Sequence, residues 1–454
     1  MAGRQLHVWV NGQRIGILQE ANDLWSFDYD DAWMEATDGF SLSPALSRSK
    51  KSHVDGATDR PVQWYFDNLL PEETMRTVLA KEAQLASEDA FGFLAHFGAE
   101  SAGSLVLLPP GIEPSDERGL KALALDVLSR RIRNLPQSSL SKDSPKRMSL
   151  AGAQHKLVVV MKDGYLYEPL PGTPSTHILK PDHPSPDYSA SVINEYFVMH
   201  LADLMGLKVP RVTRLYVPEP VYIIERFDRT VDEDTGLTRR THIIDSCQLL
   251  NKSRSFKYSA ASLPTLAAAV GMCRSRANAR VSLFRWLVFN FLLGNNDNHL
   301  KNISFTVKSS GIEVAPFYDI LSTQAYSTQA MANDRATWPN ESLAIPLGNA
   351  TITGNATFED LLAAGAALGL AKATCERELG GMVTRLPGAA EKASHVIEDQ
   401  ADQMIAKSPQ PEVTKSYMAG EFRLLRAIVS IVIRDTARLL ASPPGPKGQT
   451  QPST

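Results

Sequence analysis

The alternation of hydrophobic and polar residues predicts a strand-rich first half of the chain and a mainly helical second half. Near the amino terminus, alternating positions predict three short strands, at 7–10, 14–18 and 24–29. Asn11-Gly12 stands between the first two strands and favours a tight hairpin, because both residues tolerate positive φ. Helical spacing follows at 61–70, 71–80 and 87–97, with Ser87 as the expected cap of the last helix. Residues 1–108 are therefore predicted to form an α+β module that packs or contacts a partner.

A linker is expected next, and a second strand-rich region follows it. Proline-rich turns flank one amphipathic stretch at 119–133, so residues 109–145 are predicted to be a linker with a single helix. Beyond the linker, apolar runs predict strands at 157–160, 175–180, 212–217 and 221–228. Between the second and third of these strands, a helix is predicted at 191–205, ended by Gly206.

The second half of the chain is predicted to be mainly helical from 229 to 440. The segment at 283–293 is apolar on nearly every face and is halted by Gly294, which places it in a core. Further helices are expected at 358–370, 389–407 and 421–440, and a short hairpin is expected at 303–314. Residues 441–454 are rich in proline, glycine and polar side chains, so a disordered tail is predicted.

Composition excludes several classes of protein. At 454 residues the chain is too long for one compact core, so about two to four structural units are expected. The net charge of −3 gives no general attraction to DNA or anionic lipid, and no apolar stretch reaches the roughly 18 residues of a membrane span. The three cysteines, Cys247, Cys273 and Cys375, are far apart, which argues against a disulfide framework and fits a reducing cytoplasm.

The loop after the apolar helix carries candidate catalytic residues. Asp297 and Asn302 stand five residues apart, a predicted hairpin follows, and Asp319 comes after it. Protein-kinase-like enzymes use this order for a carboxylate that orients the attacking hydroxyl and for two magnesium ligands. Asp297 would accept the proton, Asn302 and Asp319 would bind Mg²⁺ beside the phosphates of ATP, and Lys301 would neutralise the transferred group. The alternative is a polar turn that merely leaves a buried helix.

Candidate phosphate contacts precede this loop in the chain. Residues 149–156 form a small-residue loop before a strand, where backbone amides could approach phosphates. The loop contains one glycine and matches neither Walker A nor G-x-G-x-x-G, so an ordinary hairpin entry is the alternative. Lys180 closes an apolar strand, as the phosphate-gripping lysine of kinases does, and Glu195 could pair with it. A solvated lysine and an acid that suits a helix start are the alternatives.

Six motifs stand in the order found in one protein family. They are Ser149–Lys156, His177–Lys180, Asn194–Tyr196, Glu225–Arg229, Asp297–Asn302 and Pro316–Asp319. With these motifs the chain resembles the HipA family of serine/threonine kinase toxins from bacterial type II toxin–antitoxin modules. The resemblance implies an α+β fold with two kinase-like lobes, a strand-rich lobe at 146–228 and a helical lobe at 229–440.

The resemblance also implies roles for individual residues. Asp297 would be the catalytic aspartate, and Asn302 and Asp319 would be the magnesium ligands. Ser149 would be the autophosphorylated serine, whose phosphate expels the loop and stops the kinase; Lys146 and Arg147 are near enough in sequence to hold that phosphate. The residues expected to contact ATP are Ala151, Gly152, Ala153, Gln154, His155, Lys156, Lys180, Glu225, Arg226, Phe227, His299, Lys301, Asn302, Tyr318 and Asp319.

The family implies partners as well. A HipB-like helix-turn-helix antitoxin would bind the chain and connect it to operator DNA, and the protein substrate would be an aminoacyl-tRNA synthetase, with glutamyl-tRNA synthetase as the family precedent. His155 and Asn295-Asn296 depart from the family pattern and leave the substrate open. Lys257 and Tyr258 are candidates for touching the substrate, with a solvated loop as the alternative. Two other functions stay open: a catalytically idle scaffold that assists the antitoxin, and a kinase of a small molecule or lipid.

Overall fold

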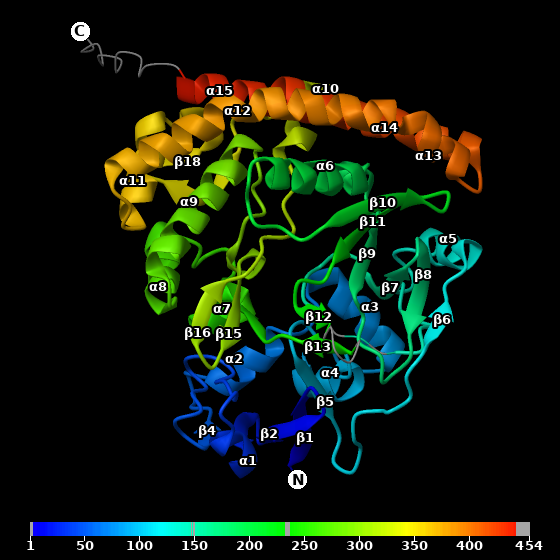
Figure 1. The fold of residues 1–454 in the computed structure, drawn as a ribbon, viewed down its shortest axis with the longest axis vertical. Helices are drawn as coiled ribbons and strands as arrows, with labels where there is room; N and C mark the ends of the chain where they lie inside the picture. The colour runs from blue at the N-terminus through cyan, green and yellow to red at the C-terminus, as the bar shows by residue number, and fades with distance from the viewer. Residues whose placement is uncertain (1–2, 147, 149, 232–236, 442–454) are drawn as a thin grey trace.

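The structure is a computed structural model that describes residues 3–146, 148, 150–231 and 237–441 (Figure 1). Strands dominate the lower part of the view and long helices cover the top, so the strand-rich and helical regions expected from the sequence are both present. The tail predicted at 441–454 lies outside the described residues except for Ala441, which ends the last helix. Within the described chain, no helix is both long and apolar enough to cross a membrane.

The amino-terminal module is an antiparallel sheet of five strands covered by short helices. The sheet order is β4-β3-β2-β1-β5, and Asn11 and Gly12 adopt positive φ in the β1–β2 turn, which confirms the predicted hairpin. The strands are β1 Arg4–Val10, β2 Gln13–Ala21, β3 Leu24–Tyr29, β4 Ser52–Val54 and β5 Leu105–Leu108. The helices are α1 Asp31–Glu35, α2 Pro61–Asp67, α3 Glu73–Ala83 and α4 Ala90–Phe97. The prediction of Ser87 as a cap is wrong, because the Asp89 carboxylate accepts the Gly92 N–H at the start of α4.

A six-stranded sheet forms the next region, in the order β10-β11-β9-β7-β8-β6. Its strands are β6 Leu120–Ala122, β7 Leu157–Lys162, β8 Tyr165–Pro169, β9 His177–Pro181, β10 Val212–Tyr216 and β11 Pro220–Glu225, and its helices are α5 Leu125–Arg133 and α6 Ser191–Leu204. The expected helix at 119–133 is therefore wrong in its first part, where β6 pairs with β8. Leu123, Leu128 and Leu140 are buried in the core of this sheet. Residues 119–140 thus belong to the sheet region rather than to a linker, because the apolar face of α5 packs against the core of this sheet.

The carboxyl-terminal region is helical and carries three small sheets. Its helices are α7 Ser246–Leu249, α8 Leu263–Met272, α9 Arg276–Leu292, α10 Gln329–Ala332, α11 Phe358–Ala367, α12 Lys372–Asp399, α13 Ala401–Lys407, α14 Pro411–Ala427 and α15 Arg434–Ala441, with a π-helical segment at Ile428–Ile433. Its strands are β12 Arg229–Val231, β13 Thr238–Arg240, β14 Ile243–Asp245, β15 Ser304–Lys308, β16 Gly311–Val314, β17 Ser342–Leu347 and β18 Ala350–Ile352. The predicted apolar helix is confirmed as the buried second half of α9, and Gly294 after it has positive φ.

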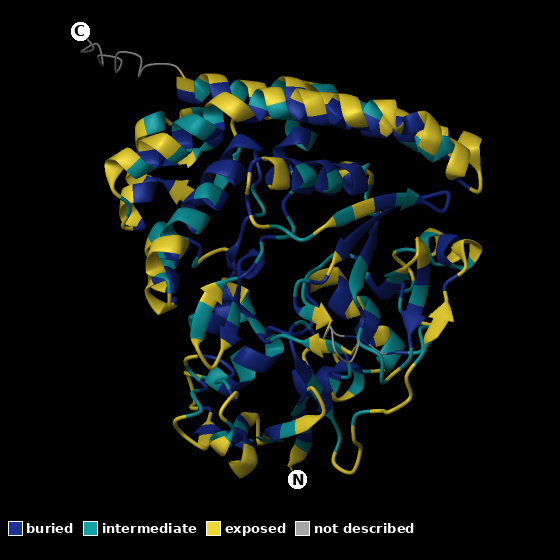
Figure 2. Cartoon of the chain, viewed as in Figure 1, coloured by how far each residue is buried: buried dark blue, intermediate teal, exposed yellow. Residues whose placement is uncertain are grey.

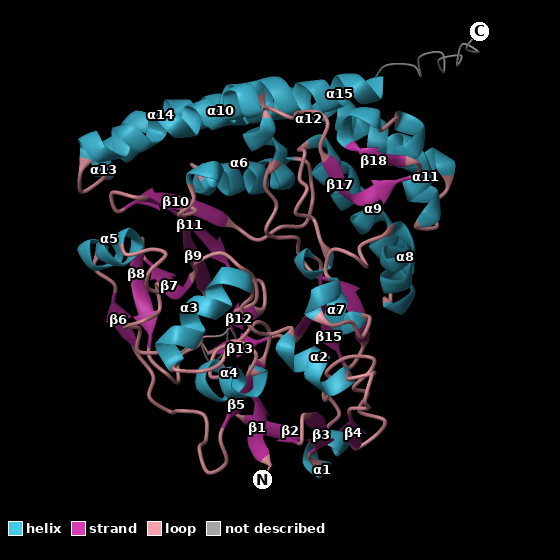
Figure 3. Ribbon diagram, turned by 180° about the vertical axis from the view of Figure 1, so that it is seen from behind, coloured by secondary structure: helices cyan, strands magenta, loops and turns pink. Residues whose placement is uncertain are grey.

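One hydrophobic core joins the amino-terminal module to the helical region. Tyr65 and Phe66 of α2 belong to the same buried cluster as Ile244 and Cys247 of the helical region. Figure 3 shows α2 beside α7 when the molecule is viewed from behind. Figure 2 shows buried and exposed positions alternating along the long upper helices, as expected for helices that cover a core with one side. The amino-terminal module is therefore packed into the molecule and is not a separate appendage.

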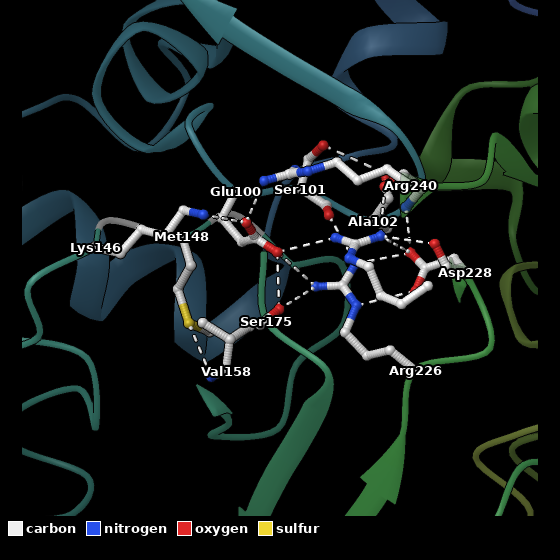
Figure 4. A network of polar contacts seen from close by, with 12 residues as sticks. Glu100, Ser101, Ala102, Lys146, Met148, Val158, Ser175, Arg226, Asp228 and Arg240 are labelled. Atoms are coloured by element: carbon white, nitrogen blue, oxygen red, sulfur yellow. Dashed lines mark hydrogen bonds and ion pairs between the residues drawn. The ribbon is translucent and has the colours of Figure 1, made fainter. Parts of the chain in front are cut away.

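A buried network of charges ties three further segments together (Figure 4). Glu100, between α4 and β5, is fully buried and lies within 3.0 Å of four cationic groups. These groups belong to Lys146, Arg226, Arg229 and Arg240. Burial alone would raise the pKa of Glu100, but the four positive charges hold it well below its usual range. Glu100 therefore stays ionised and joins the amino-terminal module to the segments before β7 and after β11.

We expect Glu100→Gln to destabilise the fold strongly. Among the described residues, the substitution leaves the four buried cations with the Asp228 carboxylate, which pairs with Arg226 and Arg229, and an unpaired buried charge typically costs about 3–5 kcal/mol. The matched control is Glu20→Gln, whose partner Arg4 is 45% exposed and whose loss should cost at most about 1 kcal/mol. Urea unfolding of both variants measures the difference, and equal losses of stability would contradict the importance of this network.

Candidate active site

A cleft of about 970 Å³ gathers most of the sequence-predicted site residues. Its walls come from the loop before β7, from β9, α6 and the end of β11, and from the loop between α9 and β15. The segment between α2 and α3 of the amino-terminal module supplies a further wall. Among the predicted ATP-contacting residues, His155 is absent from the lining of the cleft. Segments that are far apart in the sequence therefore meet around one space.

Lys180 lies between two carboxylates at the inner end of the cleft. Its ammonium is 2.7 Å from Glu195 Oε1 and 2.7 Å from Asp319 Oδ1, which confirms the predicted pairing with Glu195. Burial raises the pKa of Glu195 to about 7, with the charge of Lys180 acting in the opposite direction. Burial also acts against ionised Asp319, but Lys180 and Lys156 lower its pKa to about 2. Asp319 therefore keeps its charge, and it lines the cleft.

The loop before β7 has a backbone that requires glycine at its centre. Gly152 has φ +104°, and a Cβ atom placed there would be 2.8 Å from the Lys156 ammonium. That ammonium donates to the Ala151 carbonyl at 2.5 Å, and burial together with Lys180 lowers its pKa to about 8. The Gly152 carbonyl accepts the Glu72 N–H at 3.3 Å, so the amino-terminal module holds the loop through a backbone contact. Ser149, the predicted phosphorylation site in this loop, lies outside the described residues.

His155 is the residue of this loop that departs from the family pattern. Its side chain is buried, and burial lowers its pKa to about 4. His155 is therefore uncharged near neutral pH and adds no positive charge beside the cleft. His155 does not line the cleft, so its position does not support the predicted contact with ATP.

Asp297 is fixed through its backbone by the residues around it. Its carbonyl accepts the Asn302 side-chain amide at 2.6 Å and the His299 N–H at 2.9 Å. Its own N–H donates to Asn295 Oδ1 at 3.0 Å. The carboxylate accepts a hydrogen bond from the Tyr258 hydroxyl at 2.6 Å, and burial raises the pKa of Asp297 above its ordinary value. The spacing of Asp297 and Asn302 is thus explained by a closed loop in which the second residue fastens the first.

The magnesium-ligand prediction is compatible with the chemistry of the two side chains. Because the Asn302 amide nitrogen donates to Asp297, its oxygen is the atom left to face a cation. Asp319 uses Oδ1 for Lys180, and both residues line the cleft. Among the described residues, no cluster of three or more His, Cys, Asp or Glu side chains could hold a metal ion. One amide and one carboxylate suit Mg²⁺ only when phosphate oxygens complete its shell.

Two residues predicted to contact ATP, Lys301 and Arg226, have side chains that bind other groups of the protein. The Lys301 ammonium donates to the Asn68 carbonyl at 2.8 Å, to Asn68 Oδ1 at 2.9 Å and to Asp245 Oδ2 at 2.6 Å. An ammonium has three donors, so Lys301 anchors the loop and does not neutralise a transferred phosphoryl group in this arrangement. The Arg226 side chain enters the Glu100 network, and its N–H donates to the Thr176 carbonyl at 2.9 Å. Both residues line the cleft, so their contacts with ATP stay predictions, while the structure assigns their side chains to these other partners.

The end of β11 leaves aromatic groups for a flat ligand. The Phe227 and Tyr318 rings lie 5.6 Å apart with an interplanar angle of 30°, and both line the cleft. The Tyr318 hydroxyl donates to the Lys301 carbonyl at 2.9 Å, which fixes its ring. Glu225 closes β11 by pairing with His177 of β9. This arrangement suits an adenine ring at the predicted hinge.

The amino-terminal module was predicted only to pack or to contact a partner, but its segment 68–73 contributes to the wall of the cleft. Glu72 and Glu73 pair with the Lys257 ammonium at 2.6 and 2.9 Å. Lys257 is therefore held inside the protein and is not free to contact a substrate, whereas Tyr258 reaches Asp297. In the sequence, Pro71-Glu72-Glu73 has the pattern of a helix start, where acidic residues are common. The pattern therefore contained no signal that would separate these carboxylates from capping residues.

Comparisons with known proteins agree with this geometry. Two protein-family models match the chain: "HipA N-terminal domain" matches residues 6–108, and "HipA-like C-terminal domain" matches residues 148–390. The "Putative kinase Y4mE" of Sinorhizobium fredii is 35% identical over 346 residues, 72% of this chain and 79% of that protein. The serine/threonine-protein kinase toxin HipA of Shewanella oneidensis is 30% identical over 348 residues, 72% of this chain and 77% of that protein.

A solved structure extends the likeness to the fold. The HipA chain in a complex of Shewanella oneidensis HipA, HipB and operator DNA superimposes with a TM-score of 0.71 and 26% identity. The alignment covers 95% of this chain and 99% of that chain. The predicted α+β fold with two lobes behind an amino-terminal module is thereby confirmed.

We expect Gly152→Ala to weaken ATP binding about tenfold. The new methyl group would lie 2.8 Å from the Lys156 ammonium and push this cation from its place in the cleft lining, and the positive φ adds a strain that the control variant shares. Gly164→Ala is the matched control, because Gly164 also has positive φ but has no atom within 4 Å of the added carbon. Calorimetric titration with ATP and magnesium measures both affinities. Equal losses of ATP affinity in the two variants would contradict a specific role of Gly152 in ATP binding.

Proposed function

The chain belongs to the HipA family, and from that membership we propose that it is the kinase toxin of a toxin–antitoxin module. It would transfer the γ-phosphoryl group of ATP to a serine or threonine hydroxyl of a cellular protein. The observation that carries the proposal is the meeting of Lys180, Glu195 and Asp319 with Asp297 around one cleft. These are the parts that phosphoryl transfer requires, in the order that kinases use.

Each part has a task that follows from its surroundings. Lys180 would grip the phosphates of ATP, because it lines the cleft and, against the opposing effect of burial, the neighbouring Asp319 and Glu195 carboxylates raise its pKa. Asp297 would accept the proton of the attacking hydroxyl, since its backbone is fastened and its side chain faces the cleft. Asn302 and Asp319 would hold a magnesium ion, which neutralises phosphate charge when bound. Phe227 and Tyr318 would cover the adenine ring.

The partners proposed for the chain follow from the same family. We expect a HipB-like helix-turn-helix antitoxin, since the similar HipA of Shewanella oneidensis was solved in complex with HipB and operator DNA. The net charge of −3 supports contact with DNA only through that antitoxin. An aminoacyl-tRNA synthetase, such as glutamyl-tRNA synthetase, is the proposed substrate on the family precedent. Three unpaired buried cysteines fit the cytoplasm as the place of action.

Two alternative functions differ from this proposal in what they require of the cleft. A catalytically idle scaffold would need neither the Lys180–Glu195 pair nor the fastened Asp297, yet both are present. A kinase of a small molecule or lipid would need the same ATP machinery. The acceptor therefore has to be identified by experiment.

We expect Asp297→Asn to lower phosphate transfer at least a hundredfold while ATP affinity stays within about twofold. The substitution removes the proton acceptor and leaves the nucleotide contacts in place. The assay incubates the purified chain with γ-labelled ATP, magnesium and a cell lysate, and Asp203→Asn on the exposed face of α6 is the matched control. Label on a protein band supports the proposal. Label only in small molecules would favour the alternative acceptor, and no label would favour the scaffold.

We propose that phosphorylation of Ser149 stops the kinase. A phosphate there adds about −1.5 to −2 charge beside the site for anionic ATP, so Ser149→Asp should weaken ATP binding sharply. Ser149→Ala should bind ATP but fail to inactivate itself. Lys146 is unavailable to hold the phosphate, because its ammonium is 2.7 Å from Glu100. Mass spectrometry after incubation with ATP and magnesium provides the test, and full activity of a Ser149-phosphorylated sample would refute the switch.

A further inference from the structure

Tyr258 contacts the Asp297 carboxylate but has no role in the proposed reaction so far. Its hydroxyl donates to Asp297 Oδ1 at 2.6 Å, although the residue as a whole is 47% exposed. Its ring and the His299 ring form a T-shaped pair, with the ring centroids 4.8 Å apart and the planes at 78°. A half-exposed tyrosine has free water available to its hydroxyl, so a short hydrogen bond to a carboxylate in the cleft is a specific placement.

The loop that carries Tyr258 is fastened on two sides. The Lys257 carbonyl accepts the Leu300 N–H at 3.1 Å, which ties this loop to the one that carries Asp297. The Lys257 ammonium is held by Glu72 and Glu73 of the amino-terminal module. Neighbouring backbone bonds, such as the one from the Ala261 N–H to the Tyr258 carbonyl at 2.9 Å, close the turn. The backbone that carries the Tyr258 hydroxyl is therefore fixed relative to Asp297.

We propose that Tyr258 is a positioning residue that fixes the rotamer of the Asp297 carboxylate. With Oδ1 engaged by the Tyr258 hydroxyl, Oδ2 is left to receive the proton of the acceptor hydroxyl. The backbone contacts of Asn302 and His299 fix only the Asp297 main chain, so they leave the side-chain torsion of the aspartate undetermined. The inference rests on the proposed function, because it assigns Tyr258 a task only if Asp297 is the proton acceptor.

The hydroxyl also occupies a place that a phosphate acceptor could occupy. If Tyr258 were itself the acceptor, its oxygen would bond to the γ-phosphorus, its proton would pass to Asp297, and ADP would leave. A positioning role and an acceptor role predict different products. Only the acceptor role places phosphate on Tyr258.

The test compares Tyr258→Phe, which removes one oxygen atom, with the parent chain in the lysate assay described above. We expect the rate of phosphate transfer at saturating ATP to fall about tenfold, the lower end expected for loss of a hydrogen bond to a charged group. The Kd for ATP should stay within about twofold, since Tyr258→Phe removes the hydroxyl that contacts Asp297 and keeps the ring that packs against His299. A purely structural role would lower the melting temperature or change both constants together.

Three further variants make each outcome decisive. Tyr165→Phe on β8, 69% exposed, is the matched control and should behave as the parent. Tyr258→Ala removes the ring as well, so a loss seen in this variant but absent from Tyr258→Phe would overturn the role of the hydroxyl. Parental rates in Tyr258→Phe, or phosphotyrosine at Tyr258 in the parent, would also overturn it. Transfer by Asp297→Asn at the parental rate, or no transfer by the parent, would instead mean that the proposed function itself has failed.

Discussion

The need to pair every buried charge organises this molecule. Glu100 is buried with four cationic neighbours that come from before β7, from the end of β11 and from the β12–β13 hairpin. Removing charges from water is costly, and the contacts compensate only when all partners are in place. The three segments must therefore converge on the amino-terminal module for any of them to be stable. The same rule places Lys180 between Glu195 and Asp319 at the inner end of the cleft.

The amino-terminal module consequently contributes to the cleft as well as to packing. Its backbone meets Gly152 through Glu72, and the Glu72 carboxylate pairs with Lys257 and approaches Lys301 to 3.5 Å. The loop assigned to phosphates and the loop assigned to proton transfer thus share one neighbour. Displacement of the segment between α2 and α3 would disturb both loops together.

Much of this arrangement could be predicted from the sequence, and the errors have physical causes. Local signals were reliable where one turn or one spacing decides the structure, as at Asn11-Gly12 and at the Lys180–Glu195 pair. The single helix predicted at 389–407 is wrong in its bounds, because α12 begins at Lys372 and passes through Pro387, where buried Leu379, Met382 and Leu386 hold it by packing, and α13 follows it as a separate helix. Lys301 and Arg226 stand in motifs that were predicted to bind nucleotide, but their side-chain partners Asn68, Asp245 and Glu100 lie far away in the chain. Long-range partners leave no trace in local periodicity.

The shared core of the amino-terminal module has a consequence for how the chain is made. A ribosome delivers residues 1–108 well before Ile244 and Cys247, which share a buried cluster with Tyr65 and Phe66. Domains usually fold as units during synthesis, but part of the core around this module is completed by residues encoded more than a hundred positions later. Its apolar face is therefore exposed in the nascent chain, and contacts of such sequence separation form slowly. Expression yield should then depend on chaperone supply during translation more than on the stability of the finished protein.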